Sequence, residues 1–313
     1  MQETLLQDRF ILPFLHGGLG YQEVKPNTVS NSLIIEEDLA AFVATTTLNE
    51  KNYAVLLRKY GGDRKQLLAD LVAVIQERSA SSRNMALFLN ANKSVTLRDV
   101  RLHLFYTSDS AIHGDDLFAQ NIFSVVQELP YGYKVNDQTI FAFRPDLCFF
   151  VNGIYLGYSE LKSNFMGQSA GKNGRSKVVK DYFEAVRAYH DVFERNARLS
   201  EAERTQARRD LLKVFERAIH ITATDVGETY VIRNLADYFE EMLALCREGR
   251  FDRQVIEQKV IRDFKPYPLR QPAAEKAEKV KEIFTAHYAK GAIEKEILYY
   301  NFIERAVYKV AGV

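Results

Sequence analysis

Residues 140–162 read IFAFRPDLCFFVNGIYLGYSELK, and this stretch decides the fold. The part from Ile140 to Val151 is rich in β-branched and aromatic side chains, which favour strands. Asn152-Gly153 is the strongest short-range hairpin signal, and Ile154 to Lys162 has the composition of a returning strand. The sequence therefore predicts an antiparallel β-hairpin here.

Two acids and a lysine lie on this hairpin, namely Asp146, Glu160 and Lys162. Because side chains alternate along a strand, Glu160 and Lys162 project from one face and Leu161 points into the opposite layer. Two converging carboxylates suit Mg²⁺, which usually takes only one or two protein carboxylates and keeps several waters. We therefore expect Asp146 and Glu160 to bind Mg²⁺, and Lys162 to orient a metal-activated water.

The register of the hairpin tests whether Asp146 can join the other two residues. A strict two-residue loop pairs Val151 with Ile154 and places Asp146 opposite Ser159, on the wrong face. A three-residue loop, or a bulge near Pro145, moves Asp146 opposite Glu160 instead. We predict such an irregularity.

The remaining patterns predict an α/β protein with a mixed central sheet flanked by helices and with additional helical regions. Before residue 119, apolar stripes at helical spacing indicate mainly helices, the first over Gln2–Leu12 and ended by Pro13. Beyond it, strands are predicted near residues 123–129, 218–224 and 229–232, and helices near residues 178–189 and 200–216.

The length of 313 residues suggests about two domains. Pro266, Pro268 and Pro272 form the clearest linker signal. We therefore expect one domain over residues 1–265, with its core at about 119–232, followed by a helical segment over 266–313 that is broken around Gly291. Since no cap follows the last helix, we expect the natural chain to continue.

Composition excludes several classes of protein. The 42 Lys and Arg residues balance 41 Asp and Glu residues, so no pervasive positive field attracts polyanions and any nucleic-acid contact must be local. Two cysteines, Cys148 and Cys246, cannot build a disulfide framework or a multi-cysteine zinc site, which favours the cytoplasm. Without a signal peptide or an apolar run of about 18 residues, a soluble protein with no membrane contact is expected.

The order Pro-Asp, β-hairpin, Glu-x-Lys resembles the PD-(D/E)xK nuclease family. A longer string resembles the amino-terminal nuclease domain of the restriction (R) subunit of type I restriction-modification enzymes; it consists of Phe123-Ser-Val-Val-Gln127, Phe143-Arg-Pro-Asp146, Phe150-Val-Asn-Gly153, Leu156-Gly157 and Glu160-Leu-Lys162. The likeness is closest over about residues 120–189. It implies a restriction-endonuclease-like core, Mg²⁺-dependent cleavage of double-stranded DNA, and assembly with modification and specificity subunits.

The chain departs from this family at one motif. The family often adds Gln-x-x-x-Tyr on the following helix, and alignment of that helix leaves Tyr189 for the tyrosine but places Ala185 where the glutamine would be. Arg187 or Lys180 could supply a substitute polar contact.

R subunits also carry an ATP-driven motor after the nuclease domain. The sequence contains no G-x-x-x-x-G-K-[ST] phosphate loop. The resemblance therefore implies that residues 266–313 lead into a motor absent from this sequence, and that ATP acts only through that motor.

Each remaining candidate has a functional and a structural interpretation. The basic residues beside the predicted site could contact DNA phosphates without reading sequence, or could be a solvated loop; they are Lys172, Arg175, Lys177 and Lys180. Asp8 or Glu3 on the first helix could add a carboxylate near the metal or simply face solvent. His113 and His220 lack companions at metal-ligand spacing, so zinc is not expected.

Two other functions stay open. One is a stand-alone nuclease or resolvase of the same fold. The other is a non-catalytic module that docks subunits, in which the acid pair is structural. Its docking surfaces would be the charged helix over residues 200–216 and the late aromatic stripe of Tyr299, Tyr300, Phe302 and Tyr308, although this stripe is more typical of core packing.

Overall fold

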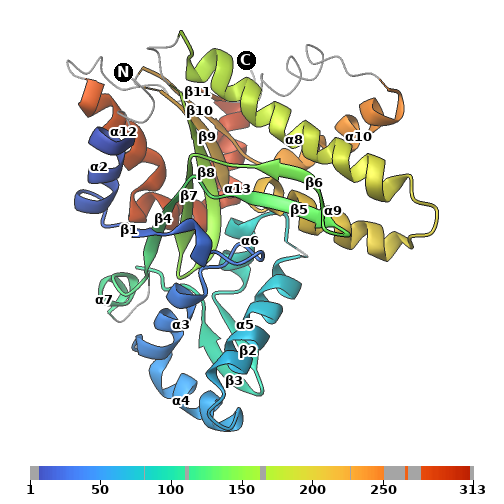
Figure 1. Cartoon of the computed structure of the whole chain (residues 1–313). Helices are drawn as coiled ribbons and strands as arrows, with labels where there is room; N and C mark the ends of the chain where they lie inside the picture. The colour runs from blue at the N-terminus through green and yellow to red at the C-terminus, as the bar shows by residue number, and fades with distance from the viewer. Residues whose placement is uncertain are drawn as a thin grey trace.

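The computed structural model describes residues 7–80, 82–109, 113–162, 167–225, 227–249, 265–266 and 276–310 (Figure 1). A seven-stranded sheet forms its centre, in the order β1-β4-β7-β8-β9-β10-β11. The pairs β1–β4 and β8–β9 are parallel and the other neighbours are antiparallel. The strands are β1 (Gln22–Val24), β4 (Phe123–Gln127), β7 (Leu147–Val151), β8 (Ile154–Leu161), β9 (His220–Thr224), β10 (Thr229–Ile232) and β11 (Lys265–Pro266).

The two faces of the sheet support two separate hydrophobic clusters, because successive strand side chains alternate. On β7, Phe149 and Val151 belong to the first cluster, whereas Cys148 and Phe150 belong to the second. Leu161 lies in the first cluster, as the alternation predicted. The mixed sheet with helices on both faces confirms the predicted fold class.

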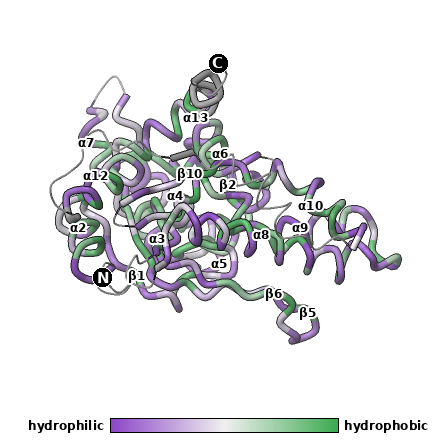
Figure 2. The backbone as a smooth tube through the Cα atoms, turned by 90° about the horizontal axis from the view of Figure 1, so that it is seen from above, coloured by the Kyte–Doolittle hydropathy of each residue, from purple (hydrophilic) through white to green (hydrophobic). Residues whose placement is uncertain are grey.

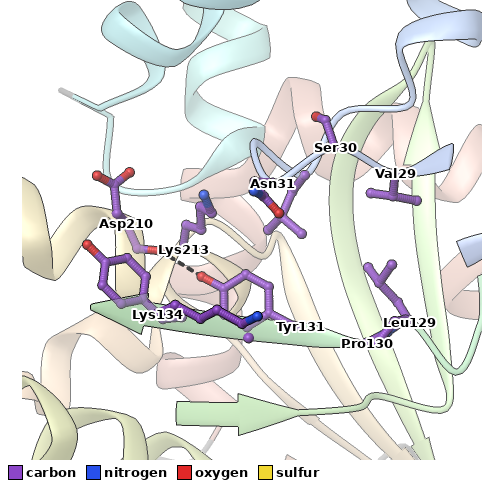
Figure 3. A pocket seen from close by; sticks show the side chains of 12 residues that line it. Val29, Ser30, Asn31, Leu129, Pro130, Tyr131, Lys134, Asp210 and Lys213 are labelled. Atoms are coloured by element: carbon purple, nitrogen blue, oxygen red, sulfur yellow. Dashed lines mark hydrogen bonds between the residues drawn. The ribbon is translucent and has the colours of Figure 1, made fainter. Parts of the chain in front are cut away.

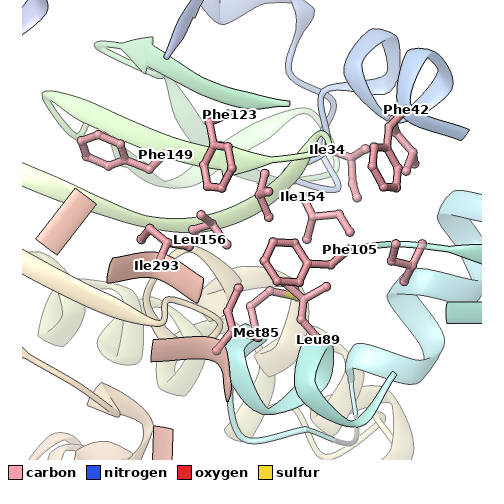
Figure 4. Close-up of a cluster of buried hydrophobic side chains, with 14 of the residues drawn as sticks. Ile34, Phe42, Met85, Leu89, Phe105, Phe123, Phe149, Ile154, Leu156 and Ile293 are labelled. Atoms are coloured by element: carbon pink, nitrogen blue, oxygen red, sulfur yellow. The ribbon is translucent and has the colours of Figure 1, made fainter. Parts of the chain in front are cut away.

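Helices from both ends of the chain cover the first face. Phe42, Leu89, Phe105 and Ile293 meet strand side chains such as Leu156 there (Figure 4). The helices that contribute to this cluster are α3 (Glu36–Thr45), α4 (Glu50–Lys59), α5 (Arg64–Ser79), α6 (Met85–Ala91), α12 (Lys276–Tyr288) and α13 (Lys290–Val310). Of these, α4 and α5 pack against a small hairpin beyond the ends of the central strands, formed by residues 94–97 and 100–103 (Figure 1).

The second face is covered by α8 (Arg175–Tyr189), α9 (Glu201–Glu216) and α10 (Phe239–Arg247), together with a second hairpin, β5 (Tyr131–Val135) and β6 (Gln138–Phe143). Seen from above, α9, α10 and this hairpin lie on the opposite side of the molecule from α2 (Leu12–Gly17) and α12 (Figure 2). The shorter helical segments are Gln7–Ile11, Pro26–Thr28, α7 (Gly114–Phe118), Ala170–Gly174, His190–Glu194 and Leu235–Tyr238.

The turn between β7 and β8 is a two-residue loop held inside the protein. Asn152 and Gly153 have φ of 49° and 77°, the left-handed values of a type I′ turn. A Cβ on Gly153 would lie 2.3 Å from the Ile35 carbonyl oxygen, so both space and conformation require glycine. The Asn152 amide donates to the Leu104 carbonyl and the Asn121 side chain, each at 2.9 Å, which satisfies a fully buried polar group.

The predicted irregularity is present in this hairpin, but on the other strand. Val151 pairs with Ile154, and the register shifts beyond Phe150 so that Phe149 pairs with Gly157. Leu156 is therefore the bulged residue; the predicted positions, a longer loop or a bulge near Pro145, were wrong. The shifted register continues to Leu147 opposite Ser159, which brings the preceding Asp146 level with Glu160.

Packing of β9 explains why the bulge lies at this point. The Leu156 carbonyl accepts a hydrogen bond from the backbone of Ile219 at 2.6 Å. A Cβ on Gly157 would lie 2.2 Å from the carbonyl oxygen of His220. The parallel neighbour therefore approaches so closely that only glycine fits beside the bulge.

Three other local predictions were wrong. The expected strand over residues 140–151 is two strands, β6 and β7, separated by Arg144-Pro145-Asp146. The region before residue 119, which was expected to be mainly helical, also contains the hairpin β2 (Ser94–Leu97) and β3 (Val100–His103). The first helix runs on through α2 because Pro13 lies in its first turn, where a missing N–H costs no hydrogen bond. Residues 2–6 of that prediction lie outside the described residues.

The late helices pack into the same core as the early ones. The gap between α12 and α13 falls at Ala289, two residues from the predicted break at Gly291. Phe284 and Ile297 are fully buried in the first cluster. The boundary at 265/266 stays a prediction, and Pro268 and Pro272 lie outside the described residues.

Candidate active site

The three hairpin residues meet on the face of the sheet that α8 covers. Glu160 is the penultimate residue of β8 and is 1% exposed, while Lys162 follows the strand and is 7% exposed. Asp146 immediately precedes β7, and its Oδ2 accepts a 2.6 Å hydrogen bond from the backbone N–H of Leu161. This bond holds the Asp146 carboxylate beside the Glu160-Leu161-Lys162 segment.

Lys162 is held by its own strand end. Its Nζ donates to Oε1 of Glu160 and to the carbonyl oxygen of Leu161, both at 2.6 Å. Short charge-assisted hydrogen bonds of this kind are stronger than neutral ones and fix a flexible lysine in one position. The ammonium therefore lies at the end of β8, within the same group as the two acids.

A second lysine contacts the other oxygen of Glu160. Lys177 of α8 donates to Glu160 Oε2 at 2.9 Å and to Asp181 Oδ2 at 3.0 Å. Burial lowers the pKa of Lys177, but the carboxylates of Glu160 and Asp181 outweigh it and raise this pKa to about 12. The buried Glu160 carboxylate thus contacts an ammonium group on each oxygen.

Sequence reasoning placed Lys177 among DNA-contacting residues and did not consider Asp181. In the structure, Lys177 forms ion pairs with Glu160 and Asp181, and its Nζ lies 5.1 Å from the ring centre of Phe143. Asp146, Glu160 and Asp181, with Lys162 and Lys177, are called the acidic group below. The i,i+4 spacing of Lys177 and Asp181 on a predicted helix was a signal that could have identified their pairing. Nothing in the sequence pointed across the fold from Lys177 to Glu160.

The donor chemistry of the site suits a hard cation. Asp146 and Glu160 offer carboxylate oxygens, and Mg²⁺ needs no more than one or two of these. Both oxygens of Glu160 contact an ammonium group, so a cation bound to Glu160 would replace one of these contacts. Within the described part of the chain, no group of three or more His, Cys, Asp or Glu side chains is arranged to hold a metal. Asp146 and Glu160 therefore fit Mg²⁺ as a two-carboxylate site completed by water.

The other basic candidates differ in what surrounds them. Lys172 and Lys180 are exposed. Arg175 donates from Nε to the Gly171 carbonyl at 2.7 Å, and its guanidinium lies 4.1 Å from the centre of the Tyr230 ring. DNA contact by these three residues stays a prediction.

The candidates on the later part of α8 lie away from the acids. Tyr189 is twelve residues beyond Lys177, about 18 Å along a helix, and its ring packs on Phe193 and Phe239. Arg187 forms an ion pair with Glu184. Ala185, at the position of the family glutamine, is fully buried, so a polar contact from that position is not available.

Asp8 and His220 are two further residues that the sequence singled out, whereas Glu3 lies outside the described residues. Asp8 is exposed on the helical turn Gln7–Ile11, which contacts the sheet through a 2.6 Å hydrogen bond from Gln7 to Gln127; a role for Asp8 stays a prediction. His220 is buried, and its Nδ1 lies 2.8 Å from Oε2 of Glu296, consistent with a core histidine.

None of the helices in the described ranges has both the length and the apolar run that crossing a bilayer requires.

Comparisons with known proteins place this architecture in a family. Searches of curated proteins and of solved structures find no match. The family model of the type I restriction enzyme R protein N terminus matches residues 1–194, which include β1, β4, β7, β8, α8 and the whole acidic group. The chain therefore belongs to the family of type I restriction enzyme R protein N-terminal regions.

Proposed function

We propose that the chain is a Mg²⁺-dependent endonuclease domain that hydrolyses phosphodiester bonds of double-stranded DNA within an ATP-dependent type I restriction enzyme. The observation that carries this proposal is the bulge at Leu156, which brings Asp146 level with Glu160. A regular hairpin would place Asp146 on the opposite face from Glu160 and Lys162, so the bulge is what makes a convergent acid pair possible.

Each residue has a distinct role in this proposal. Asp146 and Glu160 hold the metal, which when bound favours deprotonation of a water and offsets charge on the phosphate. Lys162, fixed by Glu160 and the Leu161 carbonyl, orients the attacking water and stabilises negative charge on the phosphate oxygens. The backbone N–H of Leu161 helps to keep the Asp146 carboxylate in place.

The near-neutral charge of the chain fits a domain that other parts of a complex bring to DNA. A net charge of +1 gives little non-specific affinity for a polyanion, so binding depends on local contacts and on partners. We infer that modification and specificity subunits supply recognition, and that the motor region supplies ATP-driven delivery of DNA.

The test combines metal binding by the chain with cleavage by the assembled enzyme. Mn²⁺ is titrated calorimetrically into the wild-type chain and into Asp146→Asn and Glu160→Gln, with Asp137→Asn in the exposed β5–β6 turn as the matched control. Plasmid cleavage is measured with the full complex carrying the same changes. We expect the two site variants to lose metal binding and at least a hundredfold in cleavage, and the control to keep both. Unchanged cleavage by Asp146→Asn would remove this residue from the site and favour a docking module.

A further inference from the structure

A pocket of about 480 Å³ lies between β5, α9 and the loop of residues 29–33 (Figure 3). This volume is within the range of small-molecule sites in proteins. The ring of Tyr131 forms one wall, and the Tyr131 hydroxyl is already used in a 2.6 Å hydrogen bond to the Asp210 carbonyl. The pocket is separate from the acidic group, since none of Asp146, Glu160 or Lys162 lines it.

The pocket receives the end of a lysine whose side chain is largely buried. Lys213 of α9 is 9% exposed, and its side chain extends into the pocket toward the loop that carries Asn31 (Figure 3). Over the described ranges, Lys213 Nζ forms no hydrogen bond and no ion pair within 4 Å. The carboxylate of Asp210, one turn away, instead accepts a 2.9 Å hydrogen bond from Gln206.

Burial without a partner is costly for an ammonium group, because lost hydration is not replaced. Burial accordingly lowers the pKa of Lys213 to about 8, although Asp210 opposes the shift. A ligand with negative charge would supply the missing partner. The Asn31 amide lies on the side toward which Lys213 extends, and Lys134 adds a second ammonium group to the lining (Figure 3).

We propose that this pocket binds a phosphomonoester, with Lys213 as its anion-binding residue. A compact ammonium suits the tetrahedral phosphate, whereas a planar carboxylate is better matched by an arginine fork. A terminal phosphate can enter the pocket and reach Lys213, but a phosphodiester inside a duplex is flanked on both sides and cannot. The ligand is therefore either a free mononucleotide or the phosphorylated end of a DNA strand.

Phosphate binding should also draw a proton onto Lys213. At pH 8.5 part of the Lys213 population is neutral, and an anion beside Nζ favours the charged form. The charged and titratable groups around it are Asp210 on α9, Arg217 directly after this helix, and Tyr131, Tyr133 and Lys134 on β5; the loop of residues 29–33 contributes none. Calorimetry in two buffers of different ionisation enthalpy measures this proton uptake in the wild-type chain.

The test titrates inorganic phosphate, dAMP and uncharged deoxyadenosine into the full chain at pH 7. The variants are Lys213→Met and Lys213→Gln, and Lys65→Met on the exposed surface of α5 is the matched control. We expect phosphate and dAMP to bind the wild-type chain and the control, deoxyadenosine to bind at least tenfold more weakly than dAMP, and both Lys213 variants to lose at least tenfold in affinity. Thermal melting verifies that each variant is folded.

Duplex oligonucleotides with 5′-phosphate or 5′-hydroxyl ends then distinguish the two sources. Stronger binding of the phosphorylated duplex identifies a DNA end as the ligand, whereas dAMP binding without this preference identifies a free nucleotide; either supports the proposal. Equal affinity of the wild-type chain and both Lys213 variants would overturn it. So would the absence of binding by inorganic phosphate, dAMP and phosphorylated duplex, or phosphate binding without proton uptake at pH 8.5.

Discussion

Nζ of Lys177 lies 2.9 Å from Oε2 of Glu160, so an ion pair joins helix α8 to the end of strand β8. The ammonium thereby neutralises an oxygen that would otherwise be open to a divalent cation. Because Glu160 is 1% exposed, its carboxylate cannot turn to solvent to avoid this competition. A cation that binds this oxygen in the proposed site would therefore have to displace the Lys177 ammonium.

Lys177→Met should therefore strengthen metal binding. Removal of a competing ammonium worth about 1 kcal/mol corresponds to about fivefold tighter Mn²⁺ binding. The measurement is calorimetric titration of the full chain, with exposed Lys180→Met on the same helix as control. Equal Mn²⁺ affinity of Lys177→Met and the wild-type chain would contradict competition between this ammonium and the metal.

Gly157→Ala should destabilise the protein and disturb the bulge. A Cβ at this position would lie 2.2 Å from the His220 carbonyl oxygen, which is backbone and cannot rotate away. We expect a loss of about 3 kcal/mol in the free energy of unfolding by urea. Gly61→Ala, which has open space but a positive φ, controls for glycine replacement alone and should cost about 1 kcal/mol. Equal losses at both positions would show that β9 yields to the added methyl group.

Acid should weaken the packing of α12 through His287. Burial, and to a lesser extent the charge of His220, lowers the pKa of His287 to about 3. The unfolded chain takes up a proton below about pH 6.5 while the folded chain does not, so stability falls as the pH drops from about 6.5 toward 3. The limiting slope is about 1.4 kcal/mol per pH unit.

The variant His287→Phe should flatten this part of the stability curve between pH 6 and pH 4, whereas exposed His113→Gln should not. Urea unfolding at several pH values measures both slopes. If His287→Phe keeps the wild-type slope, another group is responsible for the acid sensitivity.

Lys213→Met should stabilise the chain in phosphate-free buffer at pH 7, by about 2 kcal/mol, since it removes a desolvated charge. The folded pKa of about 8 lies below the usual value of 10.5, so the wild-type chain gains stability as the pH rises through this interval. The advantage of Lys213→Met should accordingly shrink between pH 8 and pH 10. Thermal unfolding across this range measures the difference, and a constant difference would show that Lys213 does not titrate there.

Much of the central hairpin was predictable from local sequence. Asn152-Gly153 marked the turn, and alternation placed Leu161 and Glu160 on opposite faces, because both signals depend only on neighbouring residues. The need for an irregularity also followed from counting residues. Its position did not, because it depends on the approach of His220, more than sixty residues later.

Other features lacked any local signal. The β2–β3 turn uses Arg98 and Asp99, both with left-handed φ, in place of the usual glycine-containing pair. The contact from Lys177 to Glu160 joins a helix to a strand, and the burial of Lys213 depends on a loop near residue 30. These contacts depend on tertiary packing, and the periodicity of a single sequence does not show which distant residues will pack together.

The stacking of Tyr288 on Phe149, with ring centres 3.8 Å apart, has a consequence for the order of events during synthesis. The Tyr288 hydroxyl also lies 2.7 Å from Thr222 Oγ1, so α12 contacts both β7 and β9. A nascent chain that has emerged only through β10 therefore has its central strands but not the helix that covers their first face. Until α12 emerges from the ribosome, Phe149 can pack on Tyr21 but lacks the stacked ring of Tyr288, so the first face of the sheet near the ends of these strands is only partly covered.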